Sequence, residues 1–176
     1  ESLLAKKHVF VEKPLSSKVT EGEELVELAK QQGKVLFVGH ILHYHTAIKT
    51  IKNMIQKGEL GKLQYIYSNR LNLGKIRKEE NILWSFAPHD ISVILSLVGE
   101  EPIEVTASST NILNPEIADT TVTNLKFSSG VQAHIFVSWL HPFKEQKLVI
   151  VGESGMVVFD DTATIDKKLV LYSHQI

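Results

Sequence analysis

The sequence predicts two kinds of fold in one chain: the C-terminal end of a parallel α/β sheet, then an α+β domain. We expect that second domain to contain an open-faced, mostly antiparallel sheet with helices on one face. Three observations predict this: a strand, helix and strand in the first forty residues, two later helical patterns, and strand-like segments with short turns after Pro102. The expected boundary divides residues 1–42 from residues 43–176, and we expect the second part to be incomplete at its C-terminus.

Composition excludes several classes of function. The 176 residues carry 19 Lys plus Arg against 20 Asp plus Glu, so no basic field is available to hold nucleic acid or an anionic membrane. The hydrophobic share of 43% and the charged share of 22% are typical of a globular domain. The absence of Cys excludes disulfides and thiolate chemistry, and it is compatible with the cytoplasmic location that we expect. Residues 131–143, the longest mainly apolar stretch without charge, are too few to span a bilayer.

The first elements follow from β-propensity and helical spacing. Residues 8–12 form a β-branched and aromatic run that Pro14 ends, which predicts a buried strand. Thr20 and Glu23 have capping-box spacing and precede about a dozen residues with helical periodicity. Residues 35–38 predict the next strand. This order is typical of a parallel sheet with a right-handed crossover.

A second helix and a long strand come next. Isoleucines recur at helical spacing between Thr46 and Gly58, which predicts an amphipathic helix. Residues 63–72 alternate as a strand does, with Arg70 and Asn72 on a face that is polar at its far end.

The third helix and six strands complete the chain. Pro88, followed by apolar residues at helical spacing up to Gly99, predicts a helix whose first turn carries His89 and Asp90. Short turns between the later segments imply antiparallel pairing. The predicted strands are residues 103–109, 120–127, 131–139, 147–151, 156–159 and 169–172.

Two side chains are candidates for acid–base chemistry. Lys13 follows a strand of the parallel sheet, and ligands bind beyond the carboxyl ends of such strands. The alternative is an ordinary surface lysine. His89 is expected at a helix start, where the dipole disfavours imidazolium and favours a neutral ring that accepts a proton from an alcohol. The alternative is a histidine that caps or lines the helix.

Four further residues are candidates for ligand binding. Arg70 and Asn72 share a strand face, and Asn81 and Trp84 follow after a charged loop. Guanidinium binds phosphate bidentately and an amide binds hydroxyls, so this set predicts the wall of a site for a phosphorylated or hydroxylated ligand. The alternative is a solvated, charged connection.

Further sequence patterns argue against a metal site, a phosphate-binding loop and a nucleophile elbow. His40, His43 and His45 lie close in the sequence, but no nearby carboxylate completes a zinc set, so we predict no metal site there. The ten glycines form neither a Gly-x-Gly-x-x-Gly nor a Walker motif, and no nucleophile elbow is present. These residues by themselves therefore contain no phosphate-cradling loop.

Three segments resemble one family. Residues 7–15, KHVFVEKPL, resemble the GKHVxxEKPL signature of the Gfo/Idh/MocA family of oxidoreductases. Residues 58–62, GELGK, are similar to that family's link into its sheet domain. Residues 81–90, NILWSFAPHD, resemble the NVLWDLAPHD segment of members that oxidise the 3-hydroxyl of UDP-N-acetylglucosamine-type sugars. Two departures are Lys6 in place of Gly and Ser85 in place of the Asp four residues before the motif's histidine.

The resemblance implies a fold and site residues. The fold is a Rossmann domain followed by an open-faced sheet domain, and the cofactor is NAD or NADP. Lys13 and His89 match the family's active-site Lys and His. The implied cofactor contacts are Glu12, Lys13, Pro14 and His40, and the implied substrate contacts are Arg70, Asn72, Asn81 and Trp84.

The reaction that the resemblance implies is hydride transfer from C3 of a UDP-N-acetylhexosamine, or of its uronic acid, to NAD(P)⁺. The alternatives are another sugar or polyol such as inositol, redox-neutral glycoside cleavage, and a non-catalytic dinucleotide-binding regulator. Because the family's Gly-rich segment is absent, we expect this chain to be a fragment that is inactive alone. An exposed apolar sheet face predicts a homo-dimer or homo-tetramer, with no nucleic acid or membrane as a partner.

Overall fold

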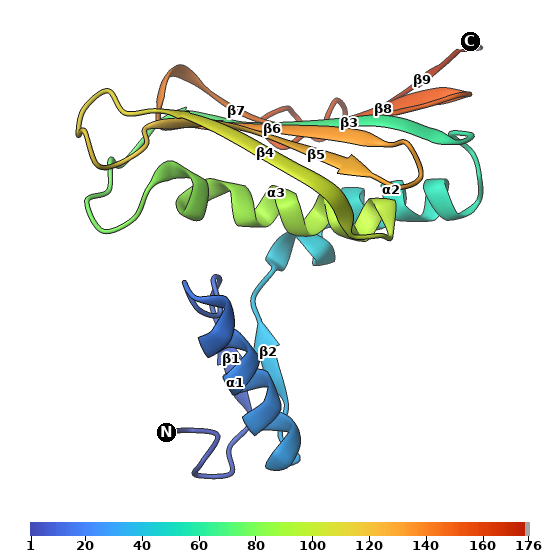
Figure 1. The fold of residues 1–176 in the computed structure, drawn as a ribbon. Coiled ribbons are helices and arrows are strands. Elements are labelled where there is room, and N and C mark those ends of the chain that lie inside the picture. The colour runs from blue at the N-terminus through green and yellow to red at the C-terminus, as the bar shows by residue number, and fades with distance from the viewer. Residues whose placement is uncertain (175–176) are drawn as a thin grey trace. The chain divides into compact units, whose positions relative to one another are not determined.

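The computed structural model describes residues 1–174. Contacts divide the chain into two compact units, Glu1–Ile41 and Leu42–Ile176. The first unit contains β1 (Val9–Val11), α1 (Val19–Gln31) and β2 (Leu36–Val38). The two strands pair in parallel, and α1 runs alongside them (Figure 1). The predicted parallel strand–helix–strand is therefore confirmed.

The start of α1 differs from the prediction. Its N-cap residue is Lys18, which makes no side-chain capping bond, so the capping box predicted at Thr20 is wrong. Ser16 lies further upstream, where its hydroxyl accepts from the Lys18 amide at 3.0 Å and donates to the Glu21 carboxylate at 2.8 Å. Glu21 is thus the carboxylate of the first turn, where the helix dipole favours negative charge.

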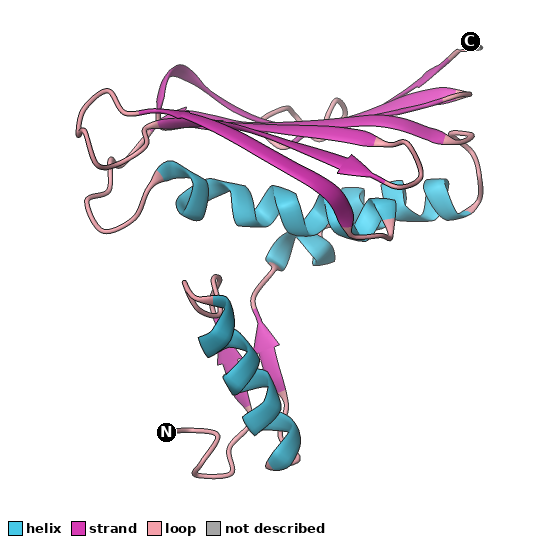
Figure 2. Cartoon of the chain, in the orientation of Figure 1, coloured by secondary structure: helices cyan, strands magenta, loops and turns pink. Residues whose placement is uncertain are grey.

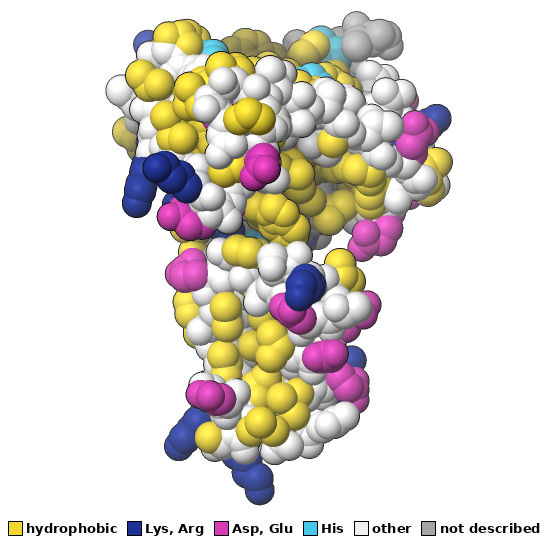
Figure 3. Space-filling model, turned by 60° about the vertical axis from the view of Figure 1, so that its left-hand side comes forward, with side chains coloured by type: hydrophobic (Ala, Val, Ile, Leu, Met, Phe, Trp, Pro, Cys, Tyr) yellow, Lys and Arg dark blue, Asp and Glu magenta, His cyan; other side chains and the backbone are white. Residues whose placement is uncertain are grey.

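The first unit buries little apolar surface. The strand at residues 8–12 was predicted to be buried, but Phe10 is 62% exposed and stacks on Phe37 with ring centroids 5.5 Å apart. Among its apolar side chains only Leu3 and Ala29 are buried. Hydrophobic side chains lie open on its surface in Figure 3. Two short strands and one helix provide too few layers to enclose a core.

The second unit is one seven-stranded sheet with helices on one face (Figure 2). A 3₁₀ turn, η1 (Ile41–Tyr44), leads into α2 (Thr46–Gln56), and α3 (Ile82–Val98) is the long helix. The strands lie in the order β4-β5-β6-β3-β7-β8-β9. Their bounds are β3 (Leu63–Leu73), β4 (Pro102–Thr110), β5 (Thr120–Phe127), β6 (Gln132–Ser138), β7 (Leu140–Gly152), β8 (Gly155–Asp160) and β9 (Leu169–Ser173).

The position of β3 decides the topology. β3 lies between β6 and β7, parallel to β6 and antiparallel to β7. The other strand pairs of this sheet are antiparallel, which confirms the prediction of a mostly antiparallel sheet. The insertion of β3 between two later strands was not predicted, because short turns indicate only which consecutive strands pair.

The core lies between this sheet and its helices. Ala133, Ile135 and Val137 of β6 point toward the helices and are at most 2% exposed. The fully buried Trp139 follows the same strand. Within residues 1–174, no helix has both the length and the apolar composition needed to cross a bilayer.

The third helix starts earlier than predicted. It begins at Ile82, six residues before Pro88, and Asn81 is its N-cap, with Oδ1 accepting from the Trp84 amide at 3.1 Å. The predicted start at Pro88 is wrong because proline also occurs inside helices, at the cost of one backbone hydrogen bond. The predicted end is confirmed, since Gly99 is the C-cap at φ 80°.

Candidate functional site

The predicted cofactor contacts gather at one edge of the first unit. Glu12, Lys13 and Pro14 follow β1 and His40 follows β2 soon after its end. The strands are parallel and end in register, and the Gly39 amide donates to the Val11 carbonyl at 2.7 Å. The structure therefore brings these four residues to the carboxyl edge of one strand pair, where ligands bind in sheets of this kind.

Gly39 allows this edge to close tightly. A Cβ added there would lie 3.2 Å from the Glu12 carboxylate oxygen Oε2 and 3.2 Å from the Phe10 ring. A larger residue would push the Glu12 side chain away from the end of β2. The edge thus carries a carboxylate, an ammonium and an imidazole, which suit the hydroxyl and amide groups of a dinucleotide.

In the second unit the chemistry centres on Asp90 of α3. Its side chain is 5% exposed and accepts three hydrogen bonds from β3. Ser68 Oγ donates at 2.7 Å, Arg70 Nε at 2.7 Å and Arg70 Nη2 at 3.1 Å. Because a buried carboxylate is stable only when paired and hydrogen-bonded, this forked contact is what lets Asp90 lie beneath the sheet.

The predicted substrate residues have different surroundings. Two of them have structural partners: two nitrogens of Arg70 are engaged by Asp90, and Asn81 caps α3. Trp84 is 41% exposed on the first turn of that helix. Asn72 is half-buried near the end of β3.

The cavity beside the ion pair is too small for a sugar. Its volume is about 10 Å³, which is room for about one water. Arg70 and Asp90 line it together with Gln146, Lys147 and Asp161 among others. A sugar does not fit inside this cavity.

His89 is the eighth residue of α3, not a first-turn residue as predicted. Because the effect of the helix dipole fades after the first turn, that dipole gives no reason to expect a neutral imidazole. The His89 carbonyl accepts from Ser92 Oγ at 2.9 Å. Ser85, one turn earlier, is buried where the resembled motif has Asp. The other predicted catalytic residue, Lys13, belongs to the first unit.

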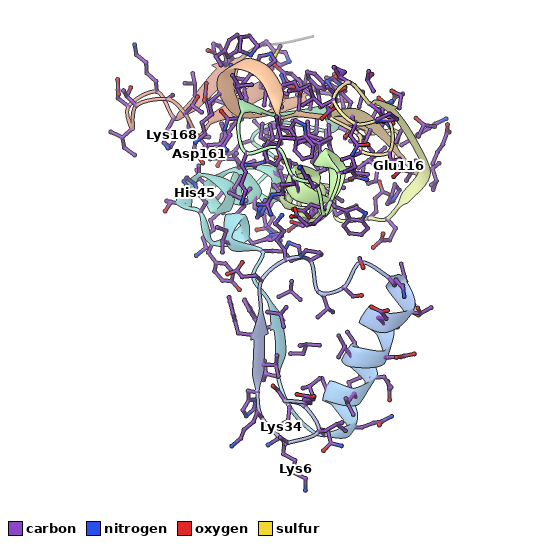
Figure 4. The ribbon with its side chains drawn as sticks, turned by 90° about the vertical axis from the view of Figure 1, so that its left-hand side faces the viewer. Lys6, Lys34, His45, Glu116, Asp161 and Lys168 are labelled. Atoms are coloured by element: carbon purple, nitrogen blue, oxygen red, sulfur yellow. The ribbon has the colours of Figure 1, made fainter. Side chains whose placement is uncertain are left out.

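His45, one of the three clustered histidines, caps a helix and lies near a carboxylate. His45 Nδ1 accepts from the Ala47 amide at 3.1 Å and so caps α2, while Nε2 lies 3.9 Å from Asp161 Oδ1. Lys168 Nζ lies 2.8 Å from the same carboxylate oxygen, and Figure 4 shows these three labelled side chains near one another. Within residues 1–174, no group of three or more metal-ligating side chains is placed to hold an ion.

The open face of the sheet carries an aromatic cluster. Tyr65 Oη and His134 Nδ1 share a hydrogen bond, and the Tyr67 ring stacks on the imidazole at 5.4 Å and 10°. Burial lowers the pKa of His134 below its ordinary 6.5, and it raises the pKa of Tyr65 with a smaller contribution from Tyr67. We call Tyr65, Tyr67 and His134 the open-face cluster.

The sequence reasoning named Arg70 and Asp90 separately and missed their pairing with Ser68. One signal was present. Asp90 is the only acidic or basic residue between Ile82 and Val98, histidine aside, in a helix otherwise built to be buried. A lone carboxylate in such a helix needs a cationic partner, and Arg70 on the polar strand face was available.

Two family models match the chain. The NAD-binding Rossmann fold of the oxidoreductase family matches residues 1–40, and the GFO/IDH/MocA C-terminal domain matches residues 48–158. A myo-inositol 2-dehydrogenase of Thermotoga maritima is 29% identical over 168 residues, which cover 89% of this chain and 50% of the relative. A UDP-N-acetylglucosamine 3-dehydrogenase of Acidithiobacillus ferrooxidans is 28% identical over 132 residues, covering 74% of this chain and 41% of the relative.

A solved structure agrees with the whole described fold. An oxidoreductase from Magnetospirillum magnetotacticum superposes with a TM-score of 0.88 at 30% identity, covering 99% of this chain and 56% of that one. The chain spans about half the length of the curated relatives it matches. Since one family model covers residues 48–158, more than half of the sequence, and the other covers residues 1–40, the chain belongs to the GFO/IDH/MocA family of oxidoreductases.

Proposed function

We propose that the protein carrying this chain is an NAD(P)-dependent dehydrogenase that oxidises C3 of a UDP-N-acetylhexosamine or of its uronic acid. The observation that carries the proposal is segment 81–90, which caps and forms the first half of α3 and ends in His89 and Asp90. Its resemblance to the corresponding segment of nucleotide-sugar dehydrogenases is supported by the similarity to the Acidithiobacillus ferrooxidans enzyme.

In the proposed mechanism, His89 takes the proton from the sugar hydroxyl as a general base. To Lys13 we assign the role of holding the reacting oxygen and stabilising the charge that develops on it. The two residues can exchange these roles, because a neutral lysine amine and a neutral imidazole each accept a proton, and their protonated forms each donate one. The bound nicotinamide supplies the hydride acceptor.

We assign the cofactor contacts to Glu12, Lys13, Pro14 and His40. Their support is the shared carboxyl edge of β1 and β2 and the close approach at Gly39. For the sugar we assign Asn72 and Trp84, together with the remaining donors of Arg70 and Asn81. We place the reaction in the cytoplasm, where the dinucleotide pool lies.

A polyol dehydrogenase is the second candidate. The similarity to the Thermotoga maritima myo-inositol 2-dehydrogenase favours it, because that match covers more of this chain than the nucleotide-sugar match does. A non-catalytic dinucleotide-binding regulator is the third, since Ser85 removes the carboxylate that the resembled motif places one turn before the histidine.

The experiment is a substrate panel in which nicotinamide fluorescence reports reduction of the cofactor. The protein, at its full encoded length, is mixed with NAD⁺ and in turn with UDP-N-acetylglucosamine, its uronic acid and myo-inositol. Cofactor reduction with a UDP-sugar alone is expected. Reduction with inositol alone supports the polyol dehydrogenase, and cofactor binding without reduction supports the regulator. The 176-residue chain, assayed in parallel, is expected to be inactive because it contains no Gly-rich loop.

We also propose that the open face of the sheet joins copies of the protein as a dimer or tetramer. The support is that both helices cover the other face, which leaves the open-face cluster and neighbouring apolar side chains such as Phe136 half-buried. Light scattering at micromolar concentration tests this. A monomer would contradict the proposal.

A further inference from the structure

We propose that Asp90 is a positioning residue for His89, held by Arg70 and Ser68 of β3 so that the helix presents the imidazole in one direction. This inference rests on the proposed function, in which His89 takes the hydroxyl proton. It concerns a group that touches neither substrate nor cofactor. Its action passes through the neighbouring residue of the same helix.

Helix α3 lacks one backbone hydrogen bond directly before His89. Pro88 lies inside α3 and has no N–H, so the backbone hydrogen bond that would reach the Trp84 carbonyl is missing. The proline ring also crowds that carbonyl, and both effects loosen the helix between its first turn and its remainder. Backbone hydrogen bonding therefore constrains the helix less at this point than elsewhere along its length.

Asp90 adds a directional polar constraint to the apolar packing of Ala87, Val93 and Ile94. Its three hydrogen bonds, at 2.7, 2.7 and 3.1 Å, come from two residues of one strand. That strand, β3, is flanked on both sides by β6 and β7 and so belongs to the interior of the sheet. Consecutive helix residues differ by about 100° around the axis, so fixing Asp90 against β3 also fixes the direction in which His89 points.

Stability alone does not explain this ion pair. Replacing a buried ion pair by well-packed apolar residues is often neutral or stabilising, so an apolar pair would serve a purely structural role at least as well. The cavity beside Arg70 and Asp90 holds about 10 Å³, room for about one water, so it does not enclose a sugar against Asp90. A role in orientation remains, since a forked carboxylate–guanidinium contact specifies geometry that apolar packing does not.

The test is a double-mutant cycle between Asp90→Asn and His89→Ala in the protein at its full encoded length. Asp90→Asn is expected to lower kcat by about 10²-fold, the cost of a misplaced catalytic group, with the KM for the dinucleotide unchanged. In the His89→Ala background it is expected to have no further effect on kcat. An equal loss of kcat in both backgrounds overturns the inference.

A second measurement does not depend on activity. The ¹H–¹⁵N signals of the His89 imidazole are expected to shift in Asp90→Asn and to stay in place in Asp160→Asn, a matched control that loses the ion pair with Lys147 at 3.6 Å. Unchanged His89 signals in Asp90→Asn overturn the inference.

An apolar replacement covers the case in which Asp90→Asn does not fold. The variant Arg70→Leu with Asp90→Leu removes both charges and is expected to fold, yet to shift the ¹H–¹⁵N signals of the His89 imidazole as Asp90→Asn does. Full kcat in this variant contradicts a positioning role. The proposed function has its own test. It fails if the single variant His89→Ala turns over substrate as fast as the wild type does.

Discussion

Asp119 shows how much structure one residue can carry. Its carboxylate is 1% exposed and accepts from the Ile112 and Leu113 amides at 2.7 and 2.8 Å and from the Trp139 indole at 2.6 Å. Burial opposes ionisation, but these donors prevail and lower the pKa of Asp119 below its ordinary 3.8. The stability that it contributes is therefore complete above about pH 4 and is lost as the pH falls through the lowered value.

We expect Asp119→Ala to destabilise the second unit by about 2–4 kcal/mol, because two amides and a buried indole lose a charged acceptor. Denaturant unfolding measures this. Glu116→Gln, on the exposed part of the same loop, is the control and is expected to stay within about 0.5 kcal/mol of the wild type. Equal stability of both variants would show that water replaces the lost acceptor.

His89→Ala is expected to lower turnover by about 10²–10⁴-fold, the usual contribution of a general base. Steady-state kinetics with the active substrate of the panel measure the change in kcat. The control is His141→Ala. His141 lies on β7, where its Nδ1 shares a hydrogen bond with the nearby Phe143 carbonyl. Near-wild-type turnover in His89→Ala would remove this residue from the mechanism.

The open-face cluster makes stability depend on pH. Because burial holds the folded-state pKa of His134 below the ordinary 6.5, the unfolded chain binds the proton more readily. Stability is expected to fall as the pH drops below about 6.5 and to stop falling below the folded pKa. Unfolding between pH 5 and 8 should show a smaller acid loss in His134→Gln than in the wild type. Identical pH profiles for His134→Gln and the wild type would contradict the expectation.

At the scale of elements, the beginning of α3 carries the candidate site. Asn81 satisfies the Trp84 amide, and the Ile82 amide donates to the Ala118 carbonyl at 3.0 Å, so the first turn is tied both to its own cap and to the segment before β5. The helix dipole, the N-cap Asn81 and Pro88 thus act on different parts of α3. The cap fixes its start, Pro88 interrupts its hydrogen bonding, and Asp90 docks its centre.

Removing the N-cap should weaken this helix. Asn81→Ala is expected to lower the free energy of unfolding by about 1 kcal/mol, while Asn81→Ser, which keeps an oxygen acceptor, is expected to stay near the wild type. Thermal unfolding compares the two variants. If alanine and serine have the same stability, the Trp84 amide is satisfied without the side chain and the capping argument fails.

At the scale of the whole molecule, the two units differ in how much core they contain. The second unit encloses one continuous apolar cluster that runs from Ala47 to Phe159. The first unit buries only Leu3 and Ala29 among its apolar side chains and leaves Phe10 exposed. Because folding must overcome the conformational entropy of every ordered residue, core size decides which unit is stable alone.

We therefore expect a polypeptide of residues 42–176 to fold cooperatively and one of residues 1–41 to remain unfolded. Circular dichroism with urea titration of each tests this. A sigmoidal transition is expected for the longer polypeptide and no transition for the shorter one. Folding of residues 1–41 by themselves, at a concentration that keeps them monomeric, would contradict the argument from core size.

Patterns within the sequence were enough to locate several strands and one helix end and to indicate the family. Periodicity located the strands that became β5 and β6, the glycine that ends α3, and the parallel pair of the first unit, because each depends on residues close in the chain. The family signature in residues 7–15 was also a local pattern.

Which strands lie side by side, and which buried polar side chains pair, followed only from the three-dimensional fold. Only it placed β3 between β6 and β7, joined Arg70 to Asp90 across 20 positions, and brought Tyr65 to His134 across 69. Periodicity records which face of an element is apolar, but it does not record which distant element covers that face. The pairing of buried polar groups follows from the packing of the whole sheet, since each such group is stable only beside the partner that the fold delivers.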